Sequence, residues 1–400
     1  MSESKPYEIV ILGGNWGGIG SAHYLLRHTI PALQKLDSTK SYHITIVTPN
    51  KDWLFKPAAP RVLVAPNLLP EEKIWRPLTE VLKQYPADQF SIVQGVATSL
   101  DSSSKTVTVK LTASGQQTVS YDSVIIATGT TGHPAWTLNE DKTLTSKTHK
   151  TIQAALQKAQ TVLIAGAGAV GLETAGEIGV AFPKIKLTVV TGAAKPLERA
   201  NNPKLSKQAE AYLTDTIKAT VINNLKVTST EGDGPTTVTL SDGSVHQVDV
   251  YINCTGGRPN SNFLPKEWLD KRGGVIKKDA YFRVRGSSDS GSDAKDVYVV
   301  GDVVAGSENS IWELEANVPV VGTAIGTDIA AKIGKAGKAP PLKEFKPIKN
   351  VMVVPIGPNG GVGQVFGWTV PSWFVKVTKA KTFLIDLLEP YAFGDKWKKP

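Results

Sequence analysis

Two stretches of this chain repeat the same order of a buried strand, a glycine-rich turn and a helix. The first is "EIVILGGNWGGIGSAHYLL" at residues 8–26, and the second is "TVLIAGAGAVGLETAGEI" at residues 161–178. Each is followed by another apolar strand, "YHITIVTP" or "KIKLTVVTG", so each completes a βαβ unit. Residues 8–129 and 161–257 are therefore two copies of one plan, which predicts an α/β fold with two parallel sheets.

The second loop fits the spacing G-x-G-x-x-G through Gly166, Gly168 and Gly171. The first glycine permits a tight turn, the second lets the backbone approach a pyrophosphate, and the third allows the helix to pack closely on the strand. The helix N-terminus then offers free N–H groups to the phosphates. This loop, with Ala169 and Val170 inside it, predicts a dinucleotide-binding, Rossmann-like unit, and the alternative is a purely structural turn.

The first loop, "GGNWGG" at residues 13–18, departs from that spacing. Its outer glycines fit, Asn15 holds the central position, and two extra glycines keep the backbone approachable. The acidic residue that would hold an adenosine ribose at the end of the next strand is missing, since "IVTP" offers only Thr48. We still expect a dinucleotide here, because two further segments accompany the loop.

Those segments are "IIATGT" at residues 125–130 and "VYVVGDVV" at residues 297–304. The first places a turn of small residues after a strand. The second puts Asp302 at a strand end, where a carboxylate can accept a hydrogen bond from a ligand hydroxyl. Neither segment is specific alone, because Gly-Asp is a common turn; they count only in this order along the chain.

The ordered set of a first glycine loop, an "ATG", a second glycine loop, "TGGRPN" at 255–260 and a late "GD" resembles that of the flavoprotein reductases with two dinucleotide-binding folds. The resemblance spans about residues 8–305. It implies FAD at the first loop and NADH or NADPH at the second. The absence of a CxxC pair argues against the disulfide reductases of this superfamily, and the single cysteine, Cys254, is expected to be a small core residue.

The segment "GPNGGVGQVFGWTVPSWFVKVTKAKTFL" at 357–384 resembles the C-terminal end of apoptosis-inducing-factor-like proteins of the ferroptosis-suppressor (AMID-like) branch. That branch consists of FAD-dependent NAD(P)H:quinone reductases. The resemblance implies catalytic roles for Lys379 and Glu173 and a flavin contact for Arg61. It also has a gap, because "WLFKP" at 53–57 replaces a histidine-containing stretch of the family.

The roles of Glu173 and Lys379 can also be argued from physical chemistry, independently of the resemblance. Glu173 is expected in the first turn of its helix, where the dipole favours a carboxylate; Lys379 could stabilise a reduced flavin or pass a proton to a quinone. The alternatives are an unliganded helix acid and a solvated lysine. No metal site is predicted. Cofactor contacts are expected from Gly13, Gly14, Asn15, Trp16, Gly17, Gly18, Arg61, Ala97, Ala127, Thr128, Gly129, Asp302, Gly166, Gly168, Ala169, Val170, Gly171 and Gly256.

The domain plan expected from these motifs is discontinuous. It assigns residues 1–130 and 255–335 to an FAD domain, residues 131–254 to an NAD(P)H domain and residues 336–400 to a small α+β cap. The cap would contact a membrane or a second copy of the chain, because Trp368, Trp373, Phe374, Lys376 and Trp397 suit a membrane surface; a core or dimer contact is the alternative.

Charge and composition bear on partners and location. The net charge is +9, which suits anionic cofactors or surfaces, although no nucleic-acid motif accompanies it. The start of the chain lacks the pattern of a signal peptide, and no apolar run is long enough to cross a bilayer. A cytoplasmic location is expected, with or without peripheral attachment to an intracellular membrane. Lys195 and Arg199 could meet a 2′-phosphate, which slightly favours NADPH or dual use.

The expected activity is hydride transfer from NAD(P)H to FAD, followed by electron transfer to a quinone-type acceptor or to oxygen. Three alternatives stay open at this point: a flavoenzyme that tailors a small secondary metabolite, a ferredoxin or rubredoxin reductase, and a signalling or DNA-binding flavoprotein with low turnover. The same motifs would serve each of them, because acceptor pockets are built from generic apolar residues.

Overall fold

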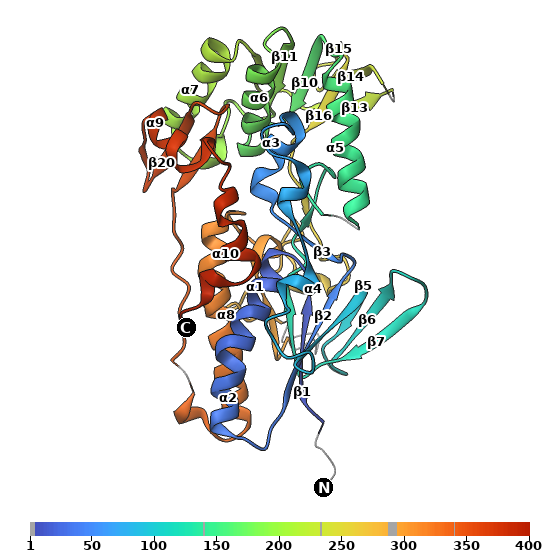
Figure 1. Ribbon diagram of the computed structural model, residues 1–400, viewed down its shortest axis with the longest axis vertical. Helices are drawn as coiled ribbons and strands as arrows, with labels where there is room; N and C mark the ends of the chain where they lie inside the picture. The colour runs from blue at the N-terminus through green and yellow to red at the C-terminus, as the bar shows by residue number, and fades with distance from the viewer. Residues whose placement is uncertain (1–4, 139–140, 233, 287–293, 340) are drawn as a thin grey trace.

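The computed structural model describes residues 5–138, 141–232, 234–286, 294–339 and 341–400. Figure 1 shows an elongated molecule with one parallel sheet in its lower half, a second in its upper half, and the C-terminal segment along one side of both. The α/β class with two Rossmann-like units and a small C-terminal α+β part is therefore confirmed.

The lower sheet has the strand order β18-β8-β1-β2-β5-β6-β7. The pairs between β18, β8, β1, β2 and β5 are parallel, whereas β5, β6 and β7 form an antiparallel meander. The strand bounds are β1 (Tyr7–Leu12), β2 (Tyr42–Thr48), β5 (Phe90–Asp101), β6 (Thr106–Leu111), β7 (Gln116–Ser120), β8 (Ser123–Ile126) and β18 (Val297–Val299). Because β18 pairs with β8 after a long excursion of the chain, this unit is built from two separate parts of the sequence.

Two long helical stretches cover one face of the lower sheet. The first runs without interruption through α1 (Trp16–Tyr24), a π-helical turn η1 (Leu25–Thr29) and α2 (Ile30–Leu36). The second is α8 (Ile311–Lys332), which Ser310 caps by accepting a hydrogen bond from the Glu313 N–H. The two stretches pack tightly, since a Cβ on Gly322 would lie 2.1 Å from the Tyr24 ring.

The upper sheet has the order β12-β11-β10-β16, with all pairs parallel, and a three-stranded antiparallel sheet lies beside it. The strands are β10 (Thr161–Ala165), β11 (Lys186–Val190), β12 (Thr220–Ile222), β13 (Val227–Glu231), β14 (Thr236–Leu240), β15 (Val245–Val248) and β16 (Val250–Asn253). The accompanying helical elements are α5 (Lys142–Leu156), α6 (Ala169–Ala181), α7 (Pro203–Ala211) and the π-helical turn η5 (Tyr212–Thr216).

Two of these helices differ from the bounds that periodicity predicts. The pattern "TIQAALQKAQ" places a helix at 151–160, but α5 begins at Lys142, because Asp141 caps it by accepting a hydrogen bond from the Thr143 N–H. Its first two turns are polar, so no apolar periodicity marks them. The sequence pattern also predicts a helix over about 204–219, but α7 gives way to η5, which ends at Thr216.

The C-terminal segment contacts both units. Its strands β19 (Met352–Pro355), β20 (Gly361–Val365) and β21 (Trp368–Thr369) pack on α6 and α7, and a Cβ on Gly176 of α6 would lie 2.2 Å from the Gly357 nitrogen. The helical part that follows returns to α1 of the lower unit (Figure 1). It comprises α9 (Ser372–Val375), the π-helical turn η9 (Lys376–Ala380), η10 (Ile385–Leu387), α10 (Leu388–Ala392) and η11 (Asp395–Trp397).

The buried apolar residues form one large cluster in each unit. The elements that connect the units contribute residues to both clusters. Leu63 and Val64 belong to the upper cluster, although their helix α3 follows the first strands of the lower unit. Val354, Ile356 and Val362 belong to the upper cluster, and Phe383 with Trp397 to the lower one. The remaining short elements include β3 (Asp52–Leu54), α3 (Ala59–Val64), β4 (Trp75–Pro77), α4 (Leu78–Val81), β9 (Thr130–Thr131), β17 (Arg258–Pro259) and η7 (Gly301–Val303).

Candidate active site

The two glycine loops have the same backbone geometry at their first glycine. Gly13 and Gly166 have φ values of +121° and +105°, a region that favours glycine. The Gly13 N–H donates to the Val47 carbonyl oxygen at 2.8 Å, and the Gly166 N–H donates to the Val190 carbonyl oxygen at 2.7 Å. Each turn is thus tied to the end of the neighbouring parallel strand, which points the following helix N-terminus to the same edge of its sheet.

The later glycines of the loops are of two kinds. At Gly18 and Gly171 other protein atoms occupy the space that a side chain would need, whereas at Gly168 that space is empty. A Cβ on Gly18 or Gly171 would lie 1.7 or 1.9 Å from the carbonyl oxygen of the first glycine, so only glycine fits there. A Cβ on Gly168 would meet nothing within 4 Å. The free space above Gly168 is the feature that a bound pyrophosphate requires.

The central position of the first loop is Asn15, and it holds the loop in place, unlike Gly168 in the second loop. The Asn15 Oδ1 accepts a hydrogen bond from the Leu54 N–H at 3.2 Å, which ties the loop to β3. The Asn15 Nδ2 is buried and has no hydrogen-bond partner among the described residues. Trp16 begins α1, donates to the Leu54 carbonyl oxygen at 2.7 Å and stacks against Trp53 with ring centres 5.0 Å apart.

A residue that sequence reasoning missed lies near the first loop. Asn50 follows β2 by two residues, is only 7% exposed, and its Oδ1 is buried without a partner among the residues that the structure describes. It stands near the strand end where an acidic ribose ligand is usual, and an amide oxygen can accept the same hydroxyl hydrogen bond. The signal was present in the sequence as a polar residue two positions after Thr48.

These observations test whether FAD fits the first loop. A buried donor on Asn15 and a buried acceptor on Asn50 lack partners, and such groups cost free energy unless a ligand or water satisfies them. A Cβ on Gly17 would lie 3.3 Å from the Val300 side chain, which places the end of β18, and with it Asp302 in η7, beside the loop. The residues present therefore fit a polar dinucleotide at this edge.

The two units also match at the turns that follow β8 and β16, which pair in parallel with β1 and β10. The Ala127 N–H donates to the Leu12 carbonyl oxygen, and the Cys254 N–H donates to the Ala165 carbonyl oxygen. Two residues later, Gly129 and Gly256 both have positive φ, and a Cβ on either would meet nothing within 4 Å. Cys254 therefore occupies the position of Ala127.

The sequence "YINCTGG" suggests that Cys254 lies within a strand, but it lies directly after β16. It is buried, in agreement with a core position, and burial raises the pKa of its thiol to about 12. Thr128 and Asn260 contact each other reciprocally, since the Thr128 Oγ1 donates to the Asn260 carbonyl oxygen at 2.6 Å and the Asn260 Nδ2 donates to the Thr128 carbonyl oxygen at 2.9 Å. Ala97 lies on β5, half-buried beside a bulge.

Lys379 and Glu173 form a buried ion pair. The Lys379 Nζ lies 2.6 Å from the Glu173 Oε1, and the two side chains are 16% and 4% exposed. Two expectations change. Glu173 is in the second turn of α6, because the helix begins at Ala169, so the helix dipole is not its main partner. Lys379 is not a solvated lysine, because η9 directs it to α6 from the C-terminal segment.

Arg61 and Glu177 form a second buried pair one helical turn further along α6. The Arg61 Nε and Nη2 each donate to a Glu177 carboxylate oxygen at 2.8 Å. Its Nη1 donates to the Lys381 carbonyl oxygen at 3.0 Å, and its guanidinium lies 4.5 Å from the centre of the Phe383 ring. Among the described residues Arg61 contacts α6 and the C-terminal segment, and its contact to the flavin stays a prediction.

The two pairs have an electrostatic consequence for Glu173. Burial raises the pKa of its carboxyl group, the Lys379 ammonium opposes that rise, and the nearby Glu177 carboxylate adds to it. Glu173 is therefore poised to carry a proton more readily than an exposed glutamate would. An acid with a perturbed pKa beside a dinucleotide loop is a candidate for a reactive group.

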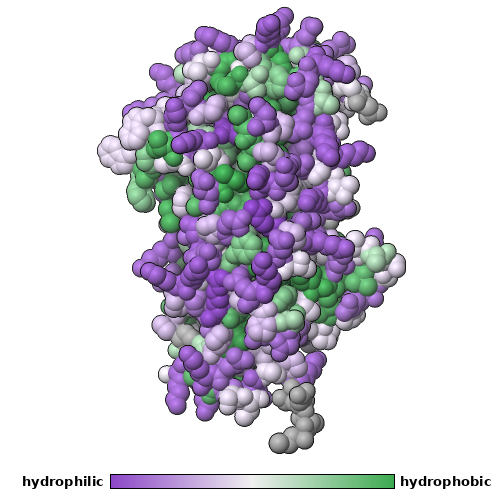
Figure 2. Space-filling view, in the orientation of Figure 1, coloured by the Kyte–Doolittle hydropathy of each residue, from purple (hydrophilic) through white to green (hydrophobic). Residues whose placement is uncertain are grey.

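The C-terminal tryptophans have two different environments. Trp397 is only 2% exposed and its Nε1 donates to the Glu315 carbonyl oxygen, so the expectation that it faces a membrane is wrong. Trp368 and Trp373 are 81% and 65% exposed, and together with Phe366 and Val377 they form an exposed patch, called here the aromatic patch. Pale and green residues gather over β20 and α9 at the upper left of Figure 2. None of the described helices is both long and apolar enough to span a bilayer.

Together, the two Rossmann-like units, their glycine loops and the ion pair between α6 and the C-terminal segment define a two-dinucleotide flavoprotein. Residues 7–324 match the family described as pyridine nucleotide-disulphide oxidoreductase, and the chain belongs to that family. It is a flavin-dependent oxidoreductase that uses FAD and a pyridine nucleotide.

Similar proteins cover nearly the whole chain. Oxidoreductase ptaL from Pestalotiopsis fici is 31% identical over 95% of this chain and 97% of its own, and oxidoreductase phnG from Penicillium herquei is 29% identical over 99% and 98%. Ferroptosis suppressor protein 1 from Homo sapiens is 23% identical over 96% and 95%.

Solved structures show the same fold. The sulfide:quinone oxidoreductase from Aquifex aeolicus superposes with a TM-score of 0.71 at 15% identity, covering 97% of this chain and 92% of that one. NDH2 from Plasmodium falciparum in complex with NADH gives 0.66 at 15% identity, with 98% and 99% covered.

Proposed function

We propose that this protein is an NAD(P)H:quinone reductase that holds FAD at the first loop and NADH or NADPH at the second. The observation that carries the proposal is the buried Lys379–Glu173 pair, which the fold assembles on the helix that starts at the second loop. The resemblance to ferroptosis suppressor proteins and the similarity in fold to a sulfide:quinone oxidoreductase support it.

When bound, FAD would supply two-electron chemistry between nucleotide and acceptor. The first loop, Asn50 and Asp302 would hold it, and the open space at Gly168 would admit the pyrophosphate of the nicotinamide nucleotide. Glu173 would hold a proton next to the nicotinamide, and Lys379 would balance negative charge there. Lys195 and Arg199, both exposed after β11, are the candidates to meet a 2′-phosphate.

We also propose that the aromatic patch contacts the surface of the membrane that holds the quinone. Indole rings and nearby lysines suit the boundary between head groups and acyl chains, and Lys376 lies in the same segment of chain. A contact between two copies of the chain is the competing use of this surface.

The deciding experiment is anaerobic stopped-flow absorbance of the purified flavoprotein at about 450 nm. We expect NADH or NADPH to bleach the flavin, and a short-chain quinone to restore its colour faster than air does. Bleaching that a quinone fails to reverse would contradict the quinone assignment and favour a different small-molecule acceptor. Absence of bleaching would contradict hydride delivery from the second loop.

A further inference from the structure

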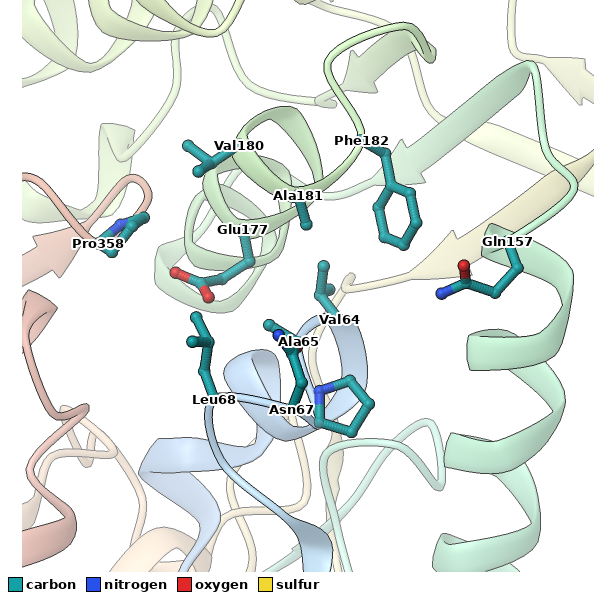
Figure 3. Close-up of a pocket in the computed structure, with 11 residues that line it drawn as sticks. Val64, Ala65, Asn67, Leu68, Gln157, Glu177, Val180, Ala181, Phe182 and Pro358 are labelled. Atoms are coloured by element: carbon teal, nitrogen blue, oxygen red, sulfur yellow. The ribbon is translucent and has the colours of Figure 1, made fainter.

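Two open surfaces of the upper unit differ in their chemistry. Figure 3 shows a groove of about 460 Å³ between the end of α6 and the loop that follows α3, lined mainly by apolar side chains. Its one ionisable residue among those described is Glu177, an acid that Arg61 already pairs. The surface beyond the end of β11 instead carries exposed cations, so a nucleotide phosphate would select this second surface.

The turn that follows β11 lies where a Rossmann-like unit meets the adenosine ribose. The residue that contacts the 2′-oxygen usually stands about 20 residues after the glycine loop, which leads here to Thr191 and Gly192. Thr191 is 7% exposed, and its Oγ1 accepts a hydrogen bond from the Ala193 N–H, so its hydroxyl already serves the turn. Gly192 has no side chain. The chain therefore offers no carboxylate at the position that would select the 2′-hydroxyl of NADH.

The side chain of Lys226 occupies the space that a side chain at position 192 would need. A Cβ on Gly192 would lie 2.7 Å from the Lys226 Cγ and 2.9 Å from its Cε, so the lysine stem crosses the glycine. Lys226 is exposed, and its ammonium pairs with no carboxylate in the part of the chain that the structure describes. The ammonium is therefore available to a ligand at this turn.

Backbone hydrogen bonds hold the segment before Lys226 against the turn. The Asn224 N–H donates to the Ala193 carbonyl oxygen at 2.9 Å, and the Leu225 N–H donates to the Thr191 carbonyl oxygen at 3.1 Å. Because the backbone of this segment is fixed on both sides of position 192, the place of Lys226 depends on the fold and not on its own side chain.

The same turn also contacts the second glycine loop. The Leu197 N–H donates to the carbonyl oxygen of Ala167, the residue directly before Gly168, at 3.0 Å. The turn at 191–199 thus connects the open space at Gly168, which suits a pyrophosphate, with the position of Lys226. A nucleotide that lies on the glycine loop would bring its adenosine ribose to this turn.

The charge of the turn distinguishes the two nicotinamide nucleotides. NADPH differs from NADH by a phosphate on the 2′-oxygen, and a phosphate monoester carries roughly −1.5 to −2 charges at pH 7. Lys195 and Arg199 are exposed on the turn, Glu198 is its one acid, and Lys226 adds a third cation. The net positive charge favours the phosphorylated nucleotide.

We propose that Lys226 binds the 2′-phosphate of NADPH and makes this protein prefer NADPH to NADH. The inference rests on the proposed function and names its electron donor. Lys226 comes from the segment after β12, so it supplies from a neighbouring strand the charge that Gly192 cannot supply from the turn itself. Lys195 and Arg199 complete the same phosphate site.

The first test measures binding without turnover. Adenosine 2′,5′-bisphosphate and adenosine 5′-phosphate are titrated into the flavin-loaded protein by calorimetry. We expect the bisphosphate to bind at least about tenfold more tightly, and Lys226→Met to lose about tenfold of that affinity, the scale of one charge-assisted hydrogen bond. Affinity for the 5′-phosphate should not change. The matched control is Lys186→Met, which removes an exposed lysine at the opposite end of β11.

The second test measures the choice of nucleotide in turnover, with ferricyanide as acceptor. We expect the ratio of kcat/KM for NADPH to kcat/KM for NADH to fall about tenfold in Lys226→Met and to stay unchanged in Lys186→Met. The double variant Gly192→Asp/Lys226→Ala places a carboxylate at the turn and clears the space that it needs. Its ratio should fall below one.

The outcomes separate this inference from the proposed function. Equal affinity of the unaltered protein for the two adenosine phosphates, or equal losses in Lys226→Met and Lys186→Met, would overturn the assignment of Lys226. If the preference for NADPH follows Lys226 but a quinone does not reoxidise the flavin, the quinone proposal fails and the inference about Lys226 stands. Absence of flavin bleaching by either nucleotide, together with absence of adenosine phosphate binding, would overturn both.

Discussion

At the scale of single residues, the glycines of the second loop show which positions serve the fold and which serve a ligand. Gly171 must be glycine because a Cβ would collide with the Gly166 carbonyl oxygen. Gly168 has a φ of −79° and open space around it, so the protein itself places no demand on that position. The requirement for glycine at this position therefore comes from the ligand that approaches the loop.

Gly168→Ala should therefore separate binding from stability. We expect the melting temperature to stay within about 2 °C, since the added methyl group meets no protein atom, while the KM for NAD(P)H rises about tenfold as the pyrophosphate is pushed away. Thermal unfolding and steady-state kinetics measure the two effects. Gly171→Ala is the contrast, with a clear loss of stability. An unchanged KM in Gly168→Ala would contradict nucleotide binding at this loop.

The ion pair on α6 makes a prediction about pH. The Lys379 ammonium lowers the pKa of Glu173 against the effect of burial, so Lys379→Met should raise that pKa further. The rate of quinone reduction should therefore show the titration of Glu173 at a higher pH in this variant than in the unaltered enzyme. Kinetics of quinone reduction between pH 5 and 10 check this, with Lys376→Met, an exposed lysine of the same turn, as control. A shift of the same size in the control would contradict a specific pairing.

At the scale of elements, the C-terminal segment is held to the first helical stretch by contacts to backbone carbonyl groups. The His23 Nε2 donates to the Ala392 carbonyl oxygen at 2.8 Å, and its Nδ1 accepts from the Tyr85 hydroxyl at 2.7 Å. Arg27 donates to the carbonyl groups of Phe393 and Gly394. These contacts depend on a neutral imidazole at His23, which is fully buried.

His23 therefore makes the fold sensitive to acid. Burial lowers its pKa from 6.5 to about 4, so the unfolded chain binds a proton more readily than the folded one. The stability is fully present above pH 6.5 and declines as pH falls toward 4. By linkage, the loss at pH 5 is about 2 kcal/mol in the free energy of unfolding.

Urea unfolding at pH 7.5 and pH 5 tests this expectation. His23→Gln can still donate to Ala392 but cannot titrate, so we expect its stability to change less between the two pH values than that of the unaltered protein. The half-buried His246 of β15 provides the matched control, His246→Gln. An equal acid-induced loss in His23→Gln and the unaltered protein would show that His23 is not the group responsible.

At the scale of the whole molecule, the aromatic patch and the net charge of +9 favour attachment to an anionic lipid surface. We expect binding to vesicles that contain anionic lipid, weakened by salt, and reduced at least about tenfold in the double variant Trp368→Ser/Trp373→Ser. Vesicle co-sedimentation measures it, and Trp312→Ser, at another exposed tryptophan, is the control. If the double variant instead converts a dimer to a monomer in sedimentation velocity, the patch is a contact between copies.

The sequence predicted the repeated units because glycine spacing and apolar strands are local signals. The sequence could not predict the side-chain contacts between elements that lie far apart along the chain. Arg61, Glu177 and Lys379 come from three distant parts of the chain, and their pairing depends on how α3, α6 and η9 pack. Trp397 is buried because Gly20 leaves room for its ring against α1, which no local pattern reveals. Asn50 is visible in the sequence as a polar residue after β2, but its burial and its lack of a partner among the described residues depend on packing.

The chain order of the Lys379–Glu173 pair has a consequence for synthesis. Lys379 follows both nucleotide-binding units in the chain, so both have been translated before this lysine is. Domains fold from the N-terminal side as they emerge. A nascent or prematurely ended chain can therefore assemble its glycine loops and still lack the cation on α6. The charge pair therefore forms only after both nucleotide-binding units and Lys379 have been made.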